Sequence, residues 1–268
     1  MQPFRVNLNP RAVAAPVQRI ATTAAQVIAA STAAFHEAEL RTPSSGGSVV
    51  YQFSFGNREP TSDERRSMYE NWLLSKGVQD LARGVRESLE AAFVYITLMR
   101  KAVDINDLAS LNAEIIRARK RAQSIREFPF PKLIRWVNDN LISPMALDSE
   151  MCSLQAIRNC LEHRGGIVGE IDLKDGKGEL TLIFTRRRMF YKLASGEEVE
   201  CLPSEKISNP QMLANAPIML GATLESRSFR LGETVKLNVV EFNEIAINCG
   251  LFGDDLVAKL PLLLPQAS

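Results

Sequence analysis

Three polar side chains near the end of a predicted helix have the types and spacing needed to act on a phosphodiester. Arg158 and Asn159 are neighbours in the chain, and His163 follows Asn159 by four positions. Because residues four apart on an α-helix lie one turn apart on the same face, Asn159 and His163 should stack. Arg158 lies about 140° around the axis from His163, a separation that a long guanidinium side chain can cover. One phosphate could therefore contact all three groups.

These residue types supply the functions that cleavage of RNA requires. A base removes the proton of the 2′-hydroxyl, an acid protonates the leaving 5′-oxygen, and positive charge stabilises the developing phosphorane oxygens. Histidine titrates near neutral pH, and arginine is a permanently charged bidentate donor. We expect His163 to act as general acid or base, Arg158 to bind the phosphate, and Asn159 to orient the imidazole. No metal ion and no cofactor is expected.

A structural role is the competing interpretation of the same residues. A protonated histidine at a helix C-terminus is favoured by the helix dipole, and Arg158 can pair with Glu162 one turn later. Under this interpretation, replacement of His163 changes stability modestly and abolishes no activity.

The segment from Ile157 to Gly166, with the sequence IRNCLEHRGG, resembles the terminal helix motif of HEPN domains. That motif has an Arg, then a polar residue that is commonly Asn, Asp or His, and a His four to six residues after the Arg. The resemblance implies a helical bundle that forms a homodimer, in which two motifs line one metal-independent endoribonuclease site. Arg158, Asn159 and His163 would be its catalytic residues. Inactive HEPN-like scaffolds imply the alternative, a module for dimerisation or for binding a ligand or protein.

The resemblance also implies RNA as the substrate and a role as a toxin or defence effector, with an inhibitory protein as a further expected partner. The four cysteines have no CxxC spacing and the chain has two histidines, so a tetrahedral zinc site is poorly supplied. Reduced thiols are typical of cytoplasmic proteins, which is the expected location. The uncharged run at residues 20–35 is too short and too polar to span a bilayer, and no membrane partner is expected.

The charge balance requires any RNA-binding surface to be local. Lys and Arg number 32 against 31 for Asp and Glu, which gives a net charge of +1. Two basic clusters are candidates for guiding the RNA backbone, together with Arg164: Arg117, Arg119, Lys120 and Arg121 in one, and Arg186, Arg187 and Arg188 in the other. We expect Arg164, Arg117, Lys120, Arg121 and Arg187 to bind substrate. The alternative is a solvated charged face, with charges at a strand end that prevent aggregation.

Apolar residues recur at helical spacing over most of the chain. They predict helices near residues 10–41, 61–103, 107–126, 148–163 and 234–260. A short apolar-rich segment at 132–141 lies between two breaks that contain proline. Asn9 before Pro10 and the capping-box pair Thr61 and Glu64 mark two helix starts, and Gly165 with Gly166 marks a helix end. Residues 1–36 contain no acid, so a transit peptide is the alternative to the first helix.

Alternating residues predict short strands at 49–55, 170–173, 180–184, 189–193, 198–202 and 223–231, with turns at Asp175-Gly176 and Ser195-Gly196. The expected fold is mainly α, a HEPN-like helical bundle with a small antiparallel β-rich insertion before the last helix. We expect an N-terminal helix and linker at residues 1–60, the bundle at 61–166, the insertion at 167–232, and at 233–268 a closing helix and tail that pack on the bundle. At 268 residues and 46% hydrophobic, the chain can bury one large core.

Overall fold

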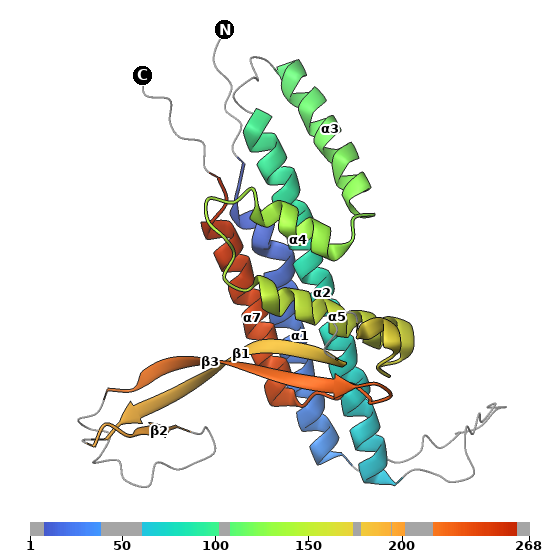
Figure 1. The fold of residues 1–268 in the computed structure, drawn as a ribbon, viewed down its shortest axis with the longest axis vertical. Helices are drawn as coiled ribbons and strands as arrows, with labels where there is room; N and C mark the ends of the chain where they lie inside the picture. The colour runs from blue at the N-terminus through green and yellow to red at the C-terminus, as the bar shows by residue number, and fades with distance from the viewer. Residues whose placement is uncertain are drawn as a thin grey trace, which may run out of the picture.

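Helices form most of the protein, and a small antiparallel sheet lies across them (Figure 1). The computed structural model describes residues 8–38, 61–101, 108–173, 178–193, 195–201 and 217–261. Its helices are α1 (Arg11–Glu37), α2 (Ser62–Lys101), α3 (Leu108–Ile125), α4 (Phe130–Asn138), α5 (Asp148–Arg164) and α7 (Val239–Ala258). The mainly helical class with a small antiparallel sheet before the last helix is confirmed. The predicted strand at 49–55 and the turn at Asp175-Gly176 lie outside the described residues.

Three of the helices begin where the sequence supplies side chains that bind unpaired backbone N–H groups. The Asn9 side chain accepts from the N–H of Arg11 at 3.0 Å. Thr61 and Glu64 form the predicted capping box, with each side chain accepting the other residue's N–H at 3.2 and 2.7 Å. Asn238 forms a second capping box at the start of α7, with Glu241 as its partner. Two of these three starts were predicted from sequence.

A single core joins α1, α2 and α7, which lie side by side (Figure 1). The apolar stripe predicted on α2 faces this core, and most of its members are buried: Leu81, Val85, Leu89, Ile96 and Met99. Gly77 lies inside α2 where side chains of α1 and α7 pack against the helix. A Cβ atom there would lie 2.6 Å from Ile28 and 2.7 Å from Phe242, so a larger residue would force these side chains to move. Residues 11–37 are therefore a core helix in this fold, as the helical interpretation of this segment expects.

The sheet has the strand order β2-β1-β3, with β1 (Glu179–Lys192) paired antiparallel to β2 (Glu198–Glu200) and to β3 (Met219–Arg230). Leu180 pairs with Phe229 and Phe190 with Glu200, and the end that carries β2 projects beyond the helices (Figure 1). The turn at Ser195-Gly196 joins β1 to β2 as predicted, with Gly196 at a φ of 86°.

Two strand predictions were wrong. The segments 180–184 and 189–193 are one continuous strand, because the arginine run between them forms ion pairs with carboxylates of both neighbouring strands and of α7. The segment predicted as a strand at 170–173 begins with a short 3₁₀ helix, Glu170–Asp172. There the Asp172 carboxylate accepts the N–H of Gly169 at 3.0 Å, which favours a tight turn over an extended chain.

β2 pairs with only the last residues of β1. Farther back along β1, side chains from α5 and α7 bond backbone groups of the strand. Ser153 of α5 accepts the N–H of Ile183 at 2.9 Å. Asn248 of α7 donates to the carbonyl of Thr185 at 3.0 Å. Both side chains are buried, and these bonds give them the partners that buried polar groups require. These bonds therefore join one edge of β1 to both helices.

No helix within the described ranges combines the length and the apolar character that crossing a membrane requires.

Candidate functional site

The helix that carries the motif, α5, is buried along one face. Its buried residues contact α2, α4 and β1, and they include Met151, Leu154, Ile157, Cys160 and Leu161. The helix ends as predicted at Gly165, which has a φ of 62°, and the following Gly166 has a φ of 82°. Both values lie in the left-handed region that favours glycine. Burial raises the pKa of the Cys160 thiol, so this cysteine is unsuited to act as a nucleophile.

The three motif residues lie on the outer side of the last turns of α5. Arg158 and Asn159 are half-buried, and His163 is exposed. The Asn159 carbonyl oxygen accepts from Gln155 at 3.0 Å and from Arg158 at 3.2 Å. The structure therefore brings Arg158 and Asn159 into direct contact, one turn before His163.

Arg158 also forms an ion pair with Glu162, as the structural interpretation of the motif expects. Both side chains are partly exposed, so the pair is screened by water and contributes little to stability. Arg158 would have to exchange Glu162 for a phosphate in order to bind substrate. The His163 imidazole has no hydrogen-bond or ion-pair partner among the described residues, and is open to an incoming group.

Arg164, expected to bind substrate, instead holds the end of α5 to the following turn. Its Nε donates to Asp172 at 2.6 Å, and Nη2 bonds the second carboxylate oxygen. The Asp172 side chain is only 4% exposed, and its carboxylate also accepts from the backbone N–H of Gly169. The Arg164 donors that face Asp172 are therefore occupied in the folded protein, and the arrangement assigns Arg164 a structural contact beside the motif.

Arg187 likewise points into the protein. It donates to Asn248 at 2.8 Å and lies 3.4 Å from Glu244, both on α7. These contacts join β1 to α7. Glu244 and Asn248 lie 57 and 61 positions away from Arg187 in the chain, so no local sequence pattern indicated this contact.

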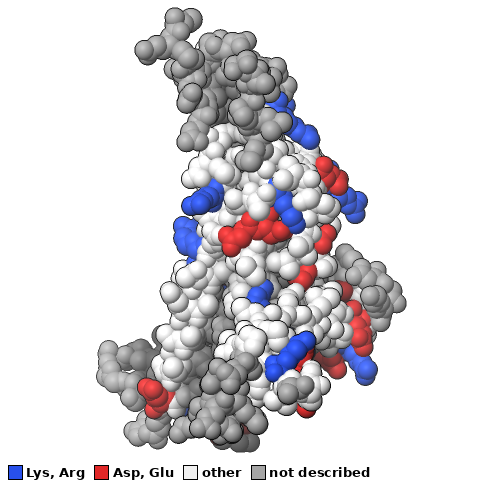
Figure 2. All heavy atoms as spheres, turned by 90° about the vertical axis from the view of Figure 1, so that its left-hand side faces the viewer, with Lys and Arg blue, Asp and Glu red and all other residues white. Residues whose placement is uncertain are grey.

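The other basic candidates lie on α3, away from the motif. Arg117, Lys120 and Arg121 are exposed, and Arg117 pairs with Glu114. In Figure 1, α3 lies at the upper end of the body, and α4 separates it from α5. On the face that Figure 2 presents, positive and negative side chains of the described residues are scattered over a largely uncharged surface. Neither view places the α3 cluster at the end of α5.

Sequence reasoning missed a cleft at the end of α5. It has a volume of about 360 Å³ and lies between α2, the last turn of α5 and the segment before α7. Trp72, Lys76 and Lys236 contribute side chains, and Leu161 and Gly165 contribute from α5. Trp72 lies on the helix predicted at 61–103, and helical periodicity alone does not indicate that its side chain is exposed.

In the described ranges, no three His, Cys, Asp or Glu side chains are grouped so that they could hold a metal ion. No protein-family model matches the chain, and no curated protein or solved structure matches it either. A function therefore has to be inferred from the residues at the end of α5.

Proposed function

We propose that this chain is a metal-independent endoribonuclease of the HEPN type that acts as a homodimer, in the role of a toxin or defence effector. One observation carries the proposal. Arg158, Asn159 and His163 share the outer side of the last turns of one anchored helix, with Arg158 and Asn159 in direct contact. The arrangement offers a permanent cation, an amide and an open imidazole to the same ligand.

In the proposed reaction, the His163 imidazole accepts the proton of the RNA 2′-hydroxyl as the oxygen attacks phosphorus. Arg158 stabilises the charge that develops on the phosphorane oxygens, and a second imidazole protonates the leaving 5′-oxygen. One motif supplies one histidine, so the acid would be the partner subunit's His163. This requirement for two imidazoles is the reason for proposing a homodimer.

The test uses purified protein and single-stranded RNA labelled at its 5′ end, with and without EDTA. We expect fragments that end in a 2′,3′-cyclic phosphate, and the same rate of cleavage in both conditions. A mass measurement in solution should give a dimer. Complete absence of cleavage across a range of RNA sequences, or cleavage that EDTA abolishes and a divalent cation restores, would contradict the proposal.

The ion pair between Arg158 and Glu162 favours a second candidate, a catalytically inactive HEPN-like module for dimerisation or ligand binding. In that case the guanidinium is committed to Glu162 and serves the helix. A dimer that cleaves no RNA would support this candidate.

Replacement of Glu162 by glutamine distinguishes the two candidates. If Arg158 binds phosphate, loss of the competing carboxylate should lower the Kd for RNA about threefold to tenfold. If Arg158 is structural, the Kd for RNA stays unchanged and the free energy of unfolding falls by less than about 1 kcal/mol. Glu87→Gln is a matched control, because Glu87 lies 4.0 Å from Arg83 at the same helical spacing on α2.

A further inference from the structure

The cleft at the end of α5 contains an unusually placed aromatic side chain. Trp72 is 68% exposed and lies on α2 at the cleft wall. The chain's other tryptophan, Trp136, is half-buried with its ring centroid 4.2 Å from that of Phe93. An indole that its own fold leaves uncovered retains both an apolar surface and a π face for a ligand.

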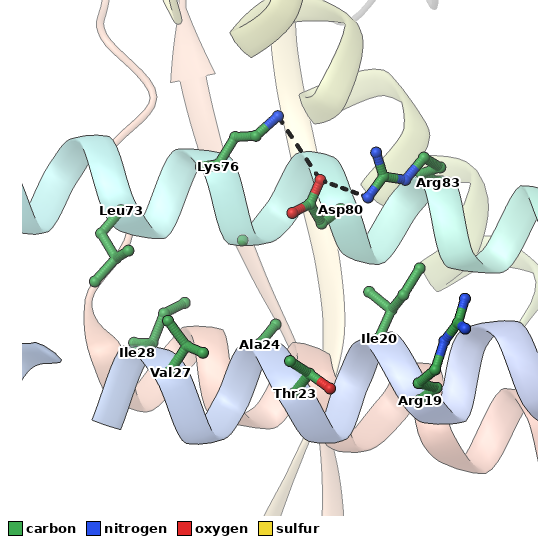
Figure 3. A pocket seen from close by; sticks show the side chains of 11 residues that line it. Arg19, Ile20, Thr23, Ala24, Val27, Ile28, Leu73, Lys76, Asp80 and Arg83 are labelled. Carbon is green, nitrogen blue, oxygen red and sulfur yellow. Dashed lines mark ion pairs between the residues drawn. The ribbon is translucent and has the colours of Figure 1, made fainter. Parts of the chain in front are cut away.

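The other cleft residues favour an anionic ligand with hydrogen-bonding groups. Lys76 and Lys236 are exposed cations, Asn71 and Gln79 carry amides, and no acidic residue lines the cleft. The Lys76 ammonium lies 3.7 Å from the carboxylate of Asp80, which lines a neighbouring groove between α1 and α2 (Figure 3). Lys236 has no ion-pair partner among the described residues. Lys236 is therefore the less restrained of the two cations.

We propose that this cleft binds one nucleotide of a single-stranded RNA, with the base stacked on Trp72 and the flanking phosphates beside Lys76 and Lys236. Aromatic platforms combined with lysines are how proteins bind unpaired strands without reading sequence. The inference rests on the proposed ribonuclease function, because it supplies the substrate-binding part of the α5 site.

The helix geometry places this nucleotide next to the reacting phosphate but not at it. Leu161 and Gly165 line the cleft from one side of α5. Arg158 lies about 60° around the axis from Leu161 in one direction, and His163 about 160° in the other. A strand held by Trp72 would therefore lie closer to Arg158 than to His163. Trp72 positions the strand and takes no part in bond breaking.

Tryptophan fluorescence tests the site without cleavage. A short oligouridylate is titrated into the His163→Ala protein in EDTA, and stacking should quench the emission of Trp72. The Trp72 variants lack this indole, so their Kd is measured by the anisotropy of an end-labelled oligouridylate. In the same background, Trp72→Ala should raise the Kd about tenfold or more, whereas Trp72→Phe should keep most of the affinity. Lys236→Ala should reduce the slope of log K against log salt concentration by about 0.7. Leu224→Ala is a matched control, because this β3 side chain is also exposed.

Three results would overturn the inference. The first is a Kd for the oligonucleotide that is unchanged in Trp72→Ala, and the second is an equal affinity of the protein for a duplex of the same length. The third is a Trp72→Ala protein whose dimer dissociates while its RNA affinity is unchanged. The last result would identify Trp72 as a protein contact. If the oligonucleotide binds through Trp72 but the wild-type protein cleaves no RNA, the ribonuclease proposal fails and the binding site stands. If the wild type cleaves and Trp72→Ala cleaves with the same KM, the binding site alone fails.

Discussion

Replacement of His163 by alanine is expected to lower the rate of RNA cleavage by about 10²- to 10⁴-fold, the usual contribution of a general acid or base. In the proposed dimer the effect lies toward the upper end of this range, because the substitution removes both imidazoles. The imidazole is exposed and has no partner among the described residues, so its loss leaves the core unchanged. The free energy of unfolding should fall by at most about 1 kcal/mol, the value of a cation at a helix C-terminus. Cleavage is followed with labelled RNA, and stability by denaturant unfolding.

The chain offers a matched control in its other histidine. His36 is exposed near the end of α1, where its Nε2 lies 3.5 Å from Glu70. His36→Ala should cleave at the wild-type rate, because this imidazole lies on another helix with no motif beside it. If His163→Ala cleaved RNA as fast as His36→Ala, histidine chemistry on α5 would be ruled out. Both variants must be prepared side by side, so that a contaminating nuclease is detected as a common background.

The helical part of this fold could be predicted because its determinants are local in sequence. The side chains of Thr61 and Glu64 bond backbone N–H groups within one turn. Gly165 adopts a left-handed conformation that other residues rarely adopt. The α5 motif could be found from the sequence for the same reason, because Asn159 and His163 are four positions apart on one helix.

Contacts between distant segments could not be predicted in this way. Arg187 was expected on an RNA-binding surface, but its partner Asn248 is 61 positions away on another helix. An arginine beside two more arginines gives no local indication that carboxylates and amides will surround it. The sequence pattern also predicted two strands where β1 is one, because the three arginines at its centre interrupt the alternation of apolar residues. Exposure of Trp72 is also a product of tertiary packing, which periodicity cannot supply.

Replacement of Arg164 by alanine is expected to lower the free energy of unfolding by about 3 kcal/mol. The substitution leaves the Asp172 carboxylate, only 4% exposed, without its cation, and breaking a buried pair costs about 3 to 5 kcal/mol. Arg164 itself is 24% exposed, so water replaces part of the lost interaction and the lower value applies. Denaturant unfolding measures the change, with Arg121→Ala as a control. Arg121 is an exposed arginine on α3, and its loss should change stability by less than about 0.5 kcal/mol.

A double-mutant cycle with Asp172→Ala separates this structural contact from a contact with RNA. Because Arg164 and Asp172 bond each other directly, their two stability effects should fall short of additivity by about 1 to 3 kcal/mol. Additive effects would contradict the pairing. RNA affinity at a temperature where every variant is folded supplies the second comparison. If Arg164 only anchors the end of α5, Arg164→Ala and Asp172→Ala should weaken RNA binding equally, since both release the same turn. A larger loss in Arg164→Ala than in Asp172→Ala would mean that the guanidinium leaves Asp172 to contact RNA.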